Sequence, residues 1–444
     1  MLEMSSGERG KDPPTRLTEP AVDADRSRSG ARWGTTLSTR GEERDHALVR
    51  RFTLLVTAGA DAGQKIVSAG DRMVVGTHNA CDVVLHDATV SRFHCEIAVA
   101  GKSIVVRDLE SSNGTLVDGI AILHAYLRGG AVLTLGRTQL RFDSGGEPVK
   151  VPLSTEEQFG ELVGSGAVMR RVFALLERAA ASDVAVLLEG EVGTGKSSAA
   201  RSLHAASARR DGPFVVVDCA TASRSLLEAE LFGSEGGFTA AAGGTLYLRE
   251  VAEIPSELHP RLAATLETRT LLFGEIARPI DVRVVAGTRR NLKTEVNARR
   301  FRSDLYHRLA VAECRLPPLR EHPEDLPMLI EEALIRAGAA PRPEVERWRN
   351  RDFYAELGRH AWPGNVRELF ELVERAVDLR ADGPSGATEE LPLSAARAAW
   401  VADFERRYLG GLLASHHGDA VAAARSAGVD GVRFGRLLDR YRLR

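Results

Sequence analysis

The segment GEVGTGKSS, residues 190–198, decides the fold at the centre of this 444-residue chain. It fits the pattern G-x-x-x-x-G-K-[ST], follows the apolar run VAVLLE and precedes the helical pattern SSAARSLHAAS. A strand, a glycine-rich loop and a helix in that order form a cradle whose backbone N–H groups surround phosphates. Its Lys would reach the outer phosphates, and its first Ser would face Mg²⁺. The predicted nucleotide-binding residues are Gly190, Glu191, Val192, Gly193, Thr194, Gly195, Lys196, Ser197 and Ser198.

The chain around this loop alternates between two patterns. From about Phe159, short apolar runs (VAVLLEG, PFVVVDC, TLYL and VRVVAG) alternate with stretches of helical periodicity. This alternation predicts a parallel sheet with crossover helices, an α/β domain that we assign to residues 155–382. Residues 320–382 show helical patterns only and would form a helical lid on that domain.

Composition bounds the class of protein. At roughly 150 residues per domain, the length predicts about three domains. Hydrophobic residues make up 43% and charged residues 27%, as in soluble globular proteins, and the formal net charge is −2. No apolar run approaches the roughly 20 residues of a membrane helix, so we expect a cytoplasmic protein without membrane contact. The four cysteines lack metal-ligand spacing, and we expect reduced thiols and no metal site made from them.

The chain before the α/β domain has two parts. Residues 1–48 are polar and without periodicity, which predicts a disordered tail. Residues 49–145 hold short alternating apolar runs punctuated by Gly, Asn and Asp, which is typical of an all-β sandwich, and EPVKVPLSTEEQ would be the linker after it. Loops at one end of a sandwich present functional side chains. The candidate phosphate donors there are Ser91, Arg92, Ser112 and Asn113, although Asn-Gly alone is also a common hairpin turn.

These loops carry a resemblance to a known family. The stretch VVGTHNACDVVLHDATVSRFHCEI…RDLESSNGTLVDG is similar to forkhead-associated (FHA) domains, which bind phosphothreonine. The resemblance implies a phosphothreonine protein as partner, held by Ser91, Arg92, Ser112 and Asn113. It also implies that His94 supports the loop. The family usually has Gly-Arg where this chain has Gly76 and Thr77, and a hydroxyl is a weaker phosphate donor than a guanidinium.

A second resemblance runs from about Phe159 to Arg380. The motifs ELFGSEGGFTA, GGTLYLREV, FRSDLYHRL, LPPLREHPEDLP and WPGNVREL are similar to the AAA+ domain of sigma-54-dependent transcriptional activators. Members of that family form homo-oligomeric rings, hydrolyse ATP between subunits, and remodel RNA polymerase carrying sigma-54 through a GAFTGA loop. The resemblance implies that Arg302 and Arg308 are arginine fingers reaching a neighbouring subunit. It also implies Arg367 as a nucleotide sensor on the lid and Glu250 as the residue that polarises the attacking water.

The catalytic motifs depart from that family in four places. Where the family has the Asp that holds Mg²⁺, this chain has Arg249, which would repel the metal by several kcal/mol at an effective dielectric of about 20. We expect Arg249 to pair with a phosphate or with Glu250. Arg289 replaces the first sensor Asn, Asp218 replaces the Asn that restrains the catalytic Glu, and GGFTAA runs almost directly into GGTLYL. The sequence therefore favours ATP binding with weak or lost hydrolysis, and it counts against Mg²⁺.

The C-terminal segment, residues 394–444, carries nine arginines against five acidic residues. Asp419 and Asp430 stand where helices would begin, with Gly428 in the turn between them. The pattern predicts a helix-turn-helix, and it resembles the Fis-type DNA-binding domain that ends sigma-54 activators. The residues expected to contact DNA are Arg433, Arg436 and Arg440. On the residues alone, a helical dimerisation hairpin stays open as the alternative.

Three functions follow from these observations. The first is a DNA-binding transcriptional regulator of the sigma-54 activator family, controlled by phosphothreonine recognition, that binds ATP and hydrolyses it weakly or not at all. The second is an active ATPase that remodels sigma-54 polymerase. The third is a phosphosignalling scaffold with nucleotide-dependent oligomerisation. Arg249, Arg289 and the shortened loop favour the first function over the second, and the basic helix-turn-helix favours it over the third.

Overall fold

A computed structural model of the chain describes residues 45–101, 103–220, 223–273, 276–338, 348, 350–378, 405–406, 408–416 and 418–443. The predicted disordered tail lies outside the described residues except for residues 45–48. Residues 379–404, the end of the predicted lid and the start of the predicted C-terminal domain, lie outside them as well. The residues up to Arg375 form one unit and those from Ala376 a second, and each is described by itself.

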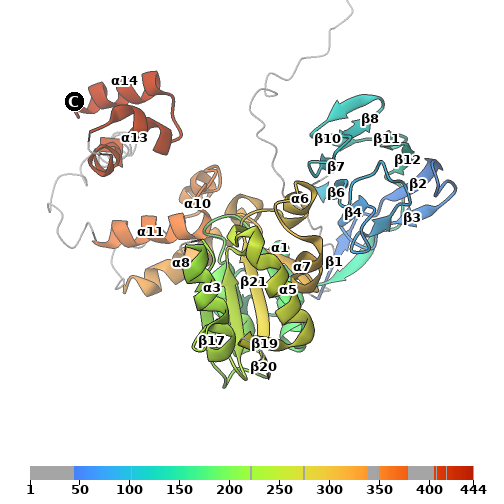
Figure 1. Cartoon of the computed structure of the whole chain (residues 1–444). Helices are drawn as coiled ribbons and strands as arrows, with labels where there is room; N and C mark the ends of the chain where they lie inside the picture. Colours follow the sequence, from blue (N-terminus) through green and yellow to red (C-terminus); the bar gives the residue numbers. More distant parts are fainter. Residues whose placement is uncertain are drawn as a thin grey trace, which may run out of the picture. The chain divides into compact units, whose positions relative to one another are not determined.

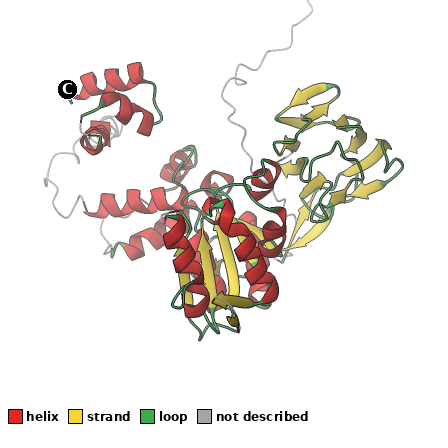
Figure 2. Cartoon of the chain, viewed as in Figure 1, coloured by secondary structure: helices red, strands yellow, loops and turns green. Residues whose placement is uncertain are grey.

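The N-terminal sandwich consists of two β-sheets, which confirms the predicted all-β class (Figure 2). One sheet, in the order β10-β7-β6-β4-β5, contains β4 (Arg72–Gly76), β5 (Val83–Val84), β6 (Cys95–Ala100), β7 (Ser103–Asp108) and β10 (His124–Leu127). The other, in the order β3-β2-β12-β11-β8-β9, contains β2 (Thr53–Ala58), β3 (Lys65–Val67), β8 (Thr115–Val117), β9 (Ile120–Ile122), β11 (Val132–Leu135) and β12 (Thr138–Asp143). Alternate side chains from both sheets, such as Val56, Ile97 and Leu140, form one buried core.

Two further strands correct the predicted boundaries. β1 (His46–Val49) begins inside the expected tail and pairs antiparallel with β13 (Val149–Pro152), inside the expected linker. Ala47 and Val49 are buried together with Val151 and Leu153. The few apolar residues of each strand are buried only when the two strands meet, so neither segment alone showed enough periodicity to predict a strand.

The central domain is built on a parallel sheet in the order β17-β18-β21-β16-β22, which confirms the predicted α/β class. Its strands are β16 (Val186–Glu189), β17 (Phe214–Asp218), β18 (Thr245–Arg249), β21 (Arg283–Thr288) and β22 (Ala312–Arg315). The longer helices around the sheet are α1 (Ala167–Ala180), α2 (Lys196–Ala205), α3 (Arg224–Phe232) and α5 (His259–Thr268) (Figure 1). The carboxyl ends of parallel strands meet at one edge, where α/β proteins bind ligands.

Shorter elements complete this unit. They are the hairpins β14 (Gln158–Phe159) with β15 (Leu162–Val163) and β19 (Thr270–Phe273) with β20 (Ile276–Pro279), the helices α4 (Gly237–Ala240), α6 (Leu292–Asn297) and α7 (Ser303–Leu309), and the 3₁₀ turns Val251–Glu253 and Ser256–Leu258. The lid contains α8 (Leu326–Arg336), α10 (Arg351–Leu357) and α11 (Asn365–Asp378), with 3₁₀ turns at Leu319–Glu321 and Pro323–Asp325. Its described residues contain helices and turns without strands, as the periodicity predicted.

The C-terminal unit contains α13 (Ala420–Ser426) and α14 (Gly431–Tyr441), and residues 408–415 are helical as well. The carboxylates of Asp419 and Asp430 accept hydrogen bonds from the first N–H groups of α13 and α14, which confirms both predicted caps. Gly428, in the turn, has a φ of 64°. Phe434 and Leu438 on α14 are buried against small residues of α13.

In the described part of the chain, each helix is too short or too polar to cross a membrane. All four cysteines (Cys81, Cys95, Cys219 and Cys314) are buried free thiols. Burial raises the pKa of the Cys81 and Cys314 thiols to about 12, so these sulfurs stay protonated.

Candidate functional site

The loop between β16 and α2 has the backbone of a phosphate cradle. Gly193 and Gly195 have φ angles of 79° and 95°, a left-handed conformation that favours glycine. Because α2 begins at Lys196, the first N–H groups of the helix have no partner within it and face the loop. The ammonium of Lys196 is buried and donates to the carbonyl oxygens of Gly190 (2.7 Å) and Glu191 (2.9 Å). Burial lowers the pKa of Lys196.

The lid contacts this loop directly. Asn365, at the start of α11, is buried and donates to the carbonyl oxygen of Val192 (2.9 Å). A Cβ on Gly193 would lie 2.0 Å from the carbonyl oxygen of Gly364, so the two backbones approach too closely for another residue. The N–H of Arg367 donates to the carbonyl of Gly193 (3.3 Å), while its side chain is exposed. Sequence reasoning named Arg367 but missed Asn365, although an Asn after Pro-Gly was a signal for a special turn.

Arg249, at the end of β18, forms an ion pair with Asp218, at the end of β17. The two residues are direct partners across the parallel strands, and the guanidinium donates to the carboxylate. This hydrogen bond raises the pKa of Arg249. Burial acts to raise the pKa of Asp218, but the bond and charge of Arg249 hold it below its usual value. The expectation that Arg249 pairs with Glu250 was wrong, because strand register places Asp218 opposite Arg249.

The backbone changes direction at Glu250, directly after the end of β18. Its φ of 54° is left-handed, an uncommon conformation for a residue with a side chain and one that clusters at functional sites. Its carboxylate accepts from the N–H of Arg289 (3.1 Å) and lies 3.9 Å from Nζ of Lys196. The side chain of Arg289 is directed instead to Glu253 (3.1 Å). The structure therefore places Glu250 beside Lys196, the lysine predicted to bind phosphate.

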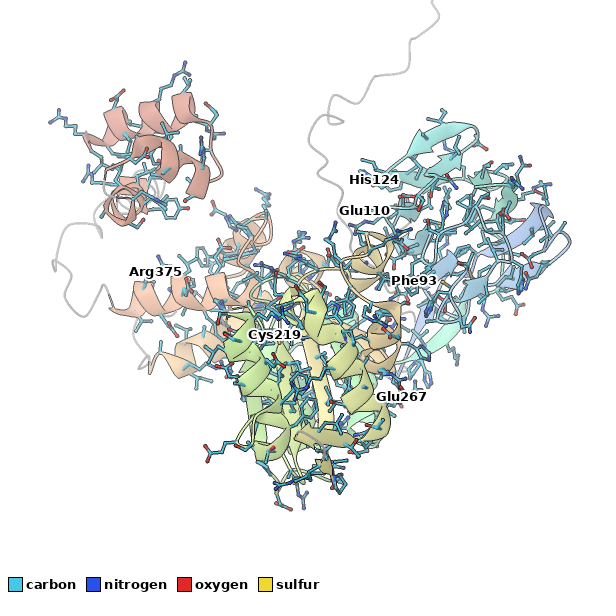
Figure 3. The ribbon with its side chains drawn as sticks, viewed as in Figure 1. Phe93, Glu110, His124, Cys219, Glu267 and Arg375 are labelled. Carbon is cyan, nitrogen blue, oxygen red and sulfur yellow. The ribbon has the colours of Figure 1, made fainter. Side chains whose placement is uncertain are left out.

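The two finger candidates lie on one segment. Arg302 precedes α7 and its guanidinium bonds the carboxylate of Asp304 (2.7 Å). Arg308, in the last turn of α7, pairs with Glu267 of α5 (2.7 Å), which Figure 3 labels. Arg302 is exposed and Arg308 partly so. Their role as fingers stays a prediction.

The shortened loop is folded into the core. Phe238, in α4, is fully buried and stacks on Phe232 with ring centroids 5.9 Å apart. Thr239 is exposed, and its hydroxyl donates to the carbonyl of Gly233 (3.3 Å). The chain then enters β18 within a few residues, without an extension between α4 and the strand. Phe238, which by resemblance corresponds to the Phe of the family's polymerase-contacting loop, is therefore packed inside the domain.

The phosphopeptide candidates lie together on two loops of the sandwich. The N–H of Ser112 donates to the hydroxyl of Ser91 (2.9 Å). The amide of Asn113 donates to the carbonyl of Thr89 (2.7 Å), so it also joins the loops. Arg92 follows Ser91 and is exposed. The structure thus brings all four predicted residues to one end of the sandwich.

His94 supports these loops from below. It is fully buried, and its Nδ1 accepts from the N–H of Ser91 (3.0 Å) while Nε2 is 3.1 Å from the carbonyl of Gly114. A ring that accepts at Nδ1 and meets a carbonyl at Nε2 is the neutral tautomer with its proton on Nε2. Burial lowers the pKa of His94, in keeping with this neutral form. The N–H of Thr77 also donates to the carbonyl of Ser91 (3.1 Å).

The arginines of α14 point away from its packed face. Phe434 and Leu438 are buried, whereas the three residues predicted to contact DNA are exposed: Arg433, Arg436 and Arg440. A helix with this division presents a continuous basic side to solvent. The structure confirms the outward orientation, and DNA contact stays a prediction.

Three family profiles match parts of the chain. The profile of the sigma-54 interaction domain matches residues 162–315, and that of the AAA+ ATPase lid domain matches residues 320–400. The profile of the cytoplasmic domain of an inner membrane component of T3SS matches residues 55–146.

Curated relatives are transcriptional regulators. ZraR of Salmonella typhimurium is 36% identical over 304 residues, which cover 63% of this chain and 68% of ZraR. GlrR of Escherichia coli is 35% identical over 312 residues, covering 65% of this chain and 70% of GlrR. NtrC of Azospirillum brasilense is 40% identical over 232 residues, or 49% of this chain and 48% of NtrC. The chain therefore belongs to the sigma-54-dependent transcriptional regulators.

Solved structures are similar over parts of the chain. NtrX from Brucella abortus in complex with ATP is 33% identical, with a TM-score of 0.46, over 64% of this chain and 70% of NtrX. A structure from work on phosphothreonine-dependent FHA domain interactions is 27% identical, with a TM-score of 0.20, over 22% of this chain and 98% of that one.

Replacing Phe238 by Ala tests whether this residue belongs to the core. We expect the unfolding free energy to fall by about 3–5 kcal/mol, because a fully buried aromatic ring is lost. Thr239→Ala, at the exposed neighbour, is the matched control and should change it by less than about 0.5 kcal/mol. Thermal and urea unfolding of both variants measure this. Equal, small effects would show that Phe238 is not a core residue.

Replacing Arg249 by Asp tests whether residue 249 faces a metal position. We expect Mg²⁺ to strengthen ATP binding to this variant by about tenfold relative to wild type, a change of about 1.4 kcal/mol. Titration calorimetry with ATP, in Mg²⁺ and in EDTA, measures the difference. Arg249→Gln is the control, because it removes the cation without adding a carboxylate. An unchanged response to Mg²⁺ in Arg249→Asp would mean that residue 249 does not face the metal position.

Proposed function

We propose that this chain is a DNA-binding transcriptional regulator that binds ATP, hydrolyses it slowly or not at all, and is controlled by phosphothreonine recognition. The ion pair between Arg249 and Asp218 carries the proposal. It lies at the carboxyl edge of the sheet, where the resemblance places the carboxylate that holds Mg²⁺. Membership in the family supports a role in transcription, and the altered edge sets this chain apart from an active ATPase.

The loop fits the triphosphate of ATP. Its left-handed glycines and the start of α2 direct backbone N–H groups to one place, as phosphate sites require. Lys196 would exchange its bonds to two loop carbonyls for bonds to phosphate oxygens. These donors and Arg367 of the lid would bind the negatively charged phosphates of ATP. The residues that would hold it are Gly190, Glu191, Val192, Gly193, Thr194, Gly195, Lys196, Ser197, Ser198 and Arg367.

The same edge does not fit Mg²⁺ well. The metal requires oxygen ligands, and the guanidinium of Arg249 offers only N–H donors. Asp218, the nearby carboxylate, is already bonded to that guanidinium. Without a metal to stabilise the charge on the transferred phosphoryl group, hydrolysis slows even with Glu250 in place.

The burial of Phe238 separates this function from that of a polymerase-remodelling ATPase. A side chain that contacts a partner protein must reach the surface, and this ring is fully buried beside Phe232. Exposing it would cost roughly the free energy of burying an aromatic residue, about 2–3 kcal/mol. Contact with RNA polymerase carrying sigma-54 is therefore not made through this residue in the described conformation.

The proposed function also implies a homo-oligomer located in the cytoplasm. Arg302 and Arg308 would stabilise phosphate charge only across a subunit boundary, which supports a homo-oligomer. A regulator that binds promoter or enhancer DNA functions in the cytoplasm of a bacterium. Nucleotide in the cradle would then bridge subunits without rapid turnover.

Phosphothreonine recognition is supported by the two joined loops. Ser91 and Ser112 hold each other through a hydrogen bond, and Asn113 is held by Thr89, so three donors are already positioned. Arg92 adds the single guanidinium among the four assigned residues. Because Thr77 stands where the family has Arg, Arg92 would provide most of the charge that a phosphate requires.

DNA binding is supported by the basic side of α14. Its exposed arginines lie on the helix that a helix-turn-helix inserts into the major groove. This observation favours a regulator over a phosphosignalling scaffold, because a scaffold does not require a helix whose exposed side is basic.

ATP turnover and open-complex formation test the proposed function together. We expect turnover at least a hundredfold below that of an active family member, and no open complex on a sigma-54 promoter, since charge stabilisation in such sites is worth about 10³–10⁵ in rate. A phosphate-release assay and permanganate footprinting with sigma-54 polymerase measure these. Turnover and open complexes near the levels of the active member would establish the remodelling ATPase instead.

Charge removal from α14 tests DNA binding. Replacing Arg433, Arg436 and Arg440 together by Gln should weaken binding to promoter DNA and reduce the salt slope of log K by up to about 3. Arg425→Gln, on α13, is the matched control and should reduce the slope by at most about 1. Fluorescence anisotropy at several salt concentrations measures both. Unchanged or only nonspecific binding would favour the scaffold.

A further inference from the structure

One face of the sandwich is packed into the core of the central domain. Val74, Cys81, Phe93 and Leu109 are buried in the hydrophobic cluster of the central domain and not in the sandwich core. Phe93 is fully buried, and its ring meets that of Tyr306 in α7 edge to face, with centroids 5.1 Å apart. Figure 3 labels Phe93 where the strands of the sandwich approach α6 and α7. The two domains therefore share apolar surface at this face.

We call the loops that carry Ser91–Arg92 and Ser112–Asn113 the pocket loops. Asn297, the last residue of α6, forms hydrogen bonds to the backbone at the base of both. Its side-chain oxygen accepts from the N–H of Phe93 (3.3 Å). Its amide donates to the carbonyl oxygens of Phe93 and of Leu109, the latter at 2.7 Å. One side chain thus satisfies three buried backbone groups, which would otherwise need other partners. The amide connects the base of the Ser91–Arg92 loop to the base of the Ser112–Asn113 loop.

Two charged side chains extend the contact toward the phosphopeptide pocket. Nη1 of Arg92 donates to the hydroxyl of Ser303 (3.3 Å), the first residue of α7. A carboxylate oxygen of Glu110 lies 3.7 Å from Nη2 of Arg300. Arg92 is itself an assigned pocket residue, and Glu110 lies two positions before Ser112. The segment that contacts the pocket, residues 297–309, also carries both finger candidates, and we call it the finger segment.

We propose that the pocket loops have two competing partners, the finger segment of the same chain and a phosphothreonine peptide. This inference rests on the phosphothreonine recognition proposed above. Arg92 is the one guanidinium among the assigned pocket residues, and a phosphate that draws it away removes its bond to Ser303. Peptide binding therefore releases the finger segment, and docking of that segment weakens peptide binding.

The competition has a quantitative consequence. A ligand that binds only the undocked form has its affinity reduced by the fraction of molecules that are undocked. Every contact that stabilises docking without touching the pocket thus weakens phosphopeptide binding. Asn297 is such a residue, because it holds the loop bases through backbone groups and belongs to the central domain.

The test compares phosphopeptide affinity in full-length variants. The probe is a fluorescent peptide mixture with one fixed phosphothreonine, with the matching threonine mixture as the blank. Asn297→Ala should bind the probe about tenfold more tightly than wild type, since the three hydrogen bonds of the Asn297 side chain in the docked form are lost. Arg299→Ala, exposed on the same segment, is the matched control and should bind like wild type. Ser303→Ala should give a smaller gain.

The outcomes separate the two proposals. Equal affinity of Asn297→Ala and wild type, with Ser91→Ala abolishing binding, would overturn the competition and leave phosphothreonine recognition standing. No binding in wild type and in Asn297→Ala would overturn phosphothreonine recognition, and the competition with it.

Hydrogen exchange gives a second, independent measurement. Backbone amides of residues 297–309 should exchange faster when wild-type protein is saturated with the phosphothreonine mixture, and equally fast in Asn297→Ala without peptide. The threonine mixture should have no effect. Unchanged exchange in this segment at saturating probe would show that peptide and finger segment do not compete.

Discussion

The ion pair between Arg249 and Asp218 fixes which charged groups stand at the carboxyl edge of the parallel sheet. Both residues end strands that lie side by side in a parallel sheet, so their opposition is fixed by the register of β17 and β18. A partly exposed ion pair of this kind contributes little to stability. Its importance comes from its position, because it places a guanidinium, bonded to a charged carboxylate, at the carboxyl edge of the parallel sheet.

The proposed nucleotide binding and the proposed loss of hydrolysis rest on different parts of this edge. The cradle is made by backbone geometry, by glycines at positive φ and by the start of α2, and none of these depends on residue 249. The lid reaches the loop through Asn365 and the close approach of Gly364 to Gly193, which again are backbone contacts. The backbone geometry of the loop is thus independent of the side chains at the ends of β17 and β18. Phe238 has a structural role of its own, since its ring is fully buried beside Phe232.

The sandwich and the central domain are in direct contact through buried apolar side chains, in addition to the chain that joins them. The outer apolar surface of the sandwich is covered by α6 and α7, and β1 pairs with β13 where the chain passes between the domains. The loops that carry Ser91 and Ser112 therefore meet the finger segment along a buried apolar surface. If the sandwich binds phosphothreonine as proposed, this contact is the physical route from the bound phosphate to the central domain.

The sequence alone determined the order of domains, the fold of each, the phosphate cradle and both caps of the helix-turn-helix. These features depend on local periodicity, on glycine at special angles and on short-range hydrogen bonds, which neighbouring residues specify. It also identified Arg249 as a departure from the family's second motif. Only the tertiary structure showed that Asp218 is its partner, because strand pairing joins residues that the sequence separates. Long-range packing likewise decides the burial of Phe238, the pairing of β1 with β13, and the hydrogen bonds of Asn297 to Phe93 and Leu109. A single sequence contains no local signal for such contacts.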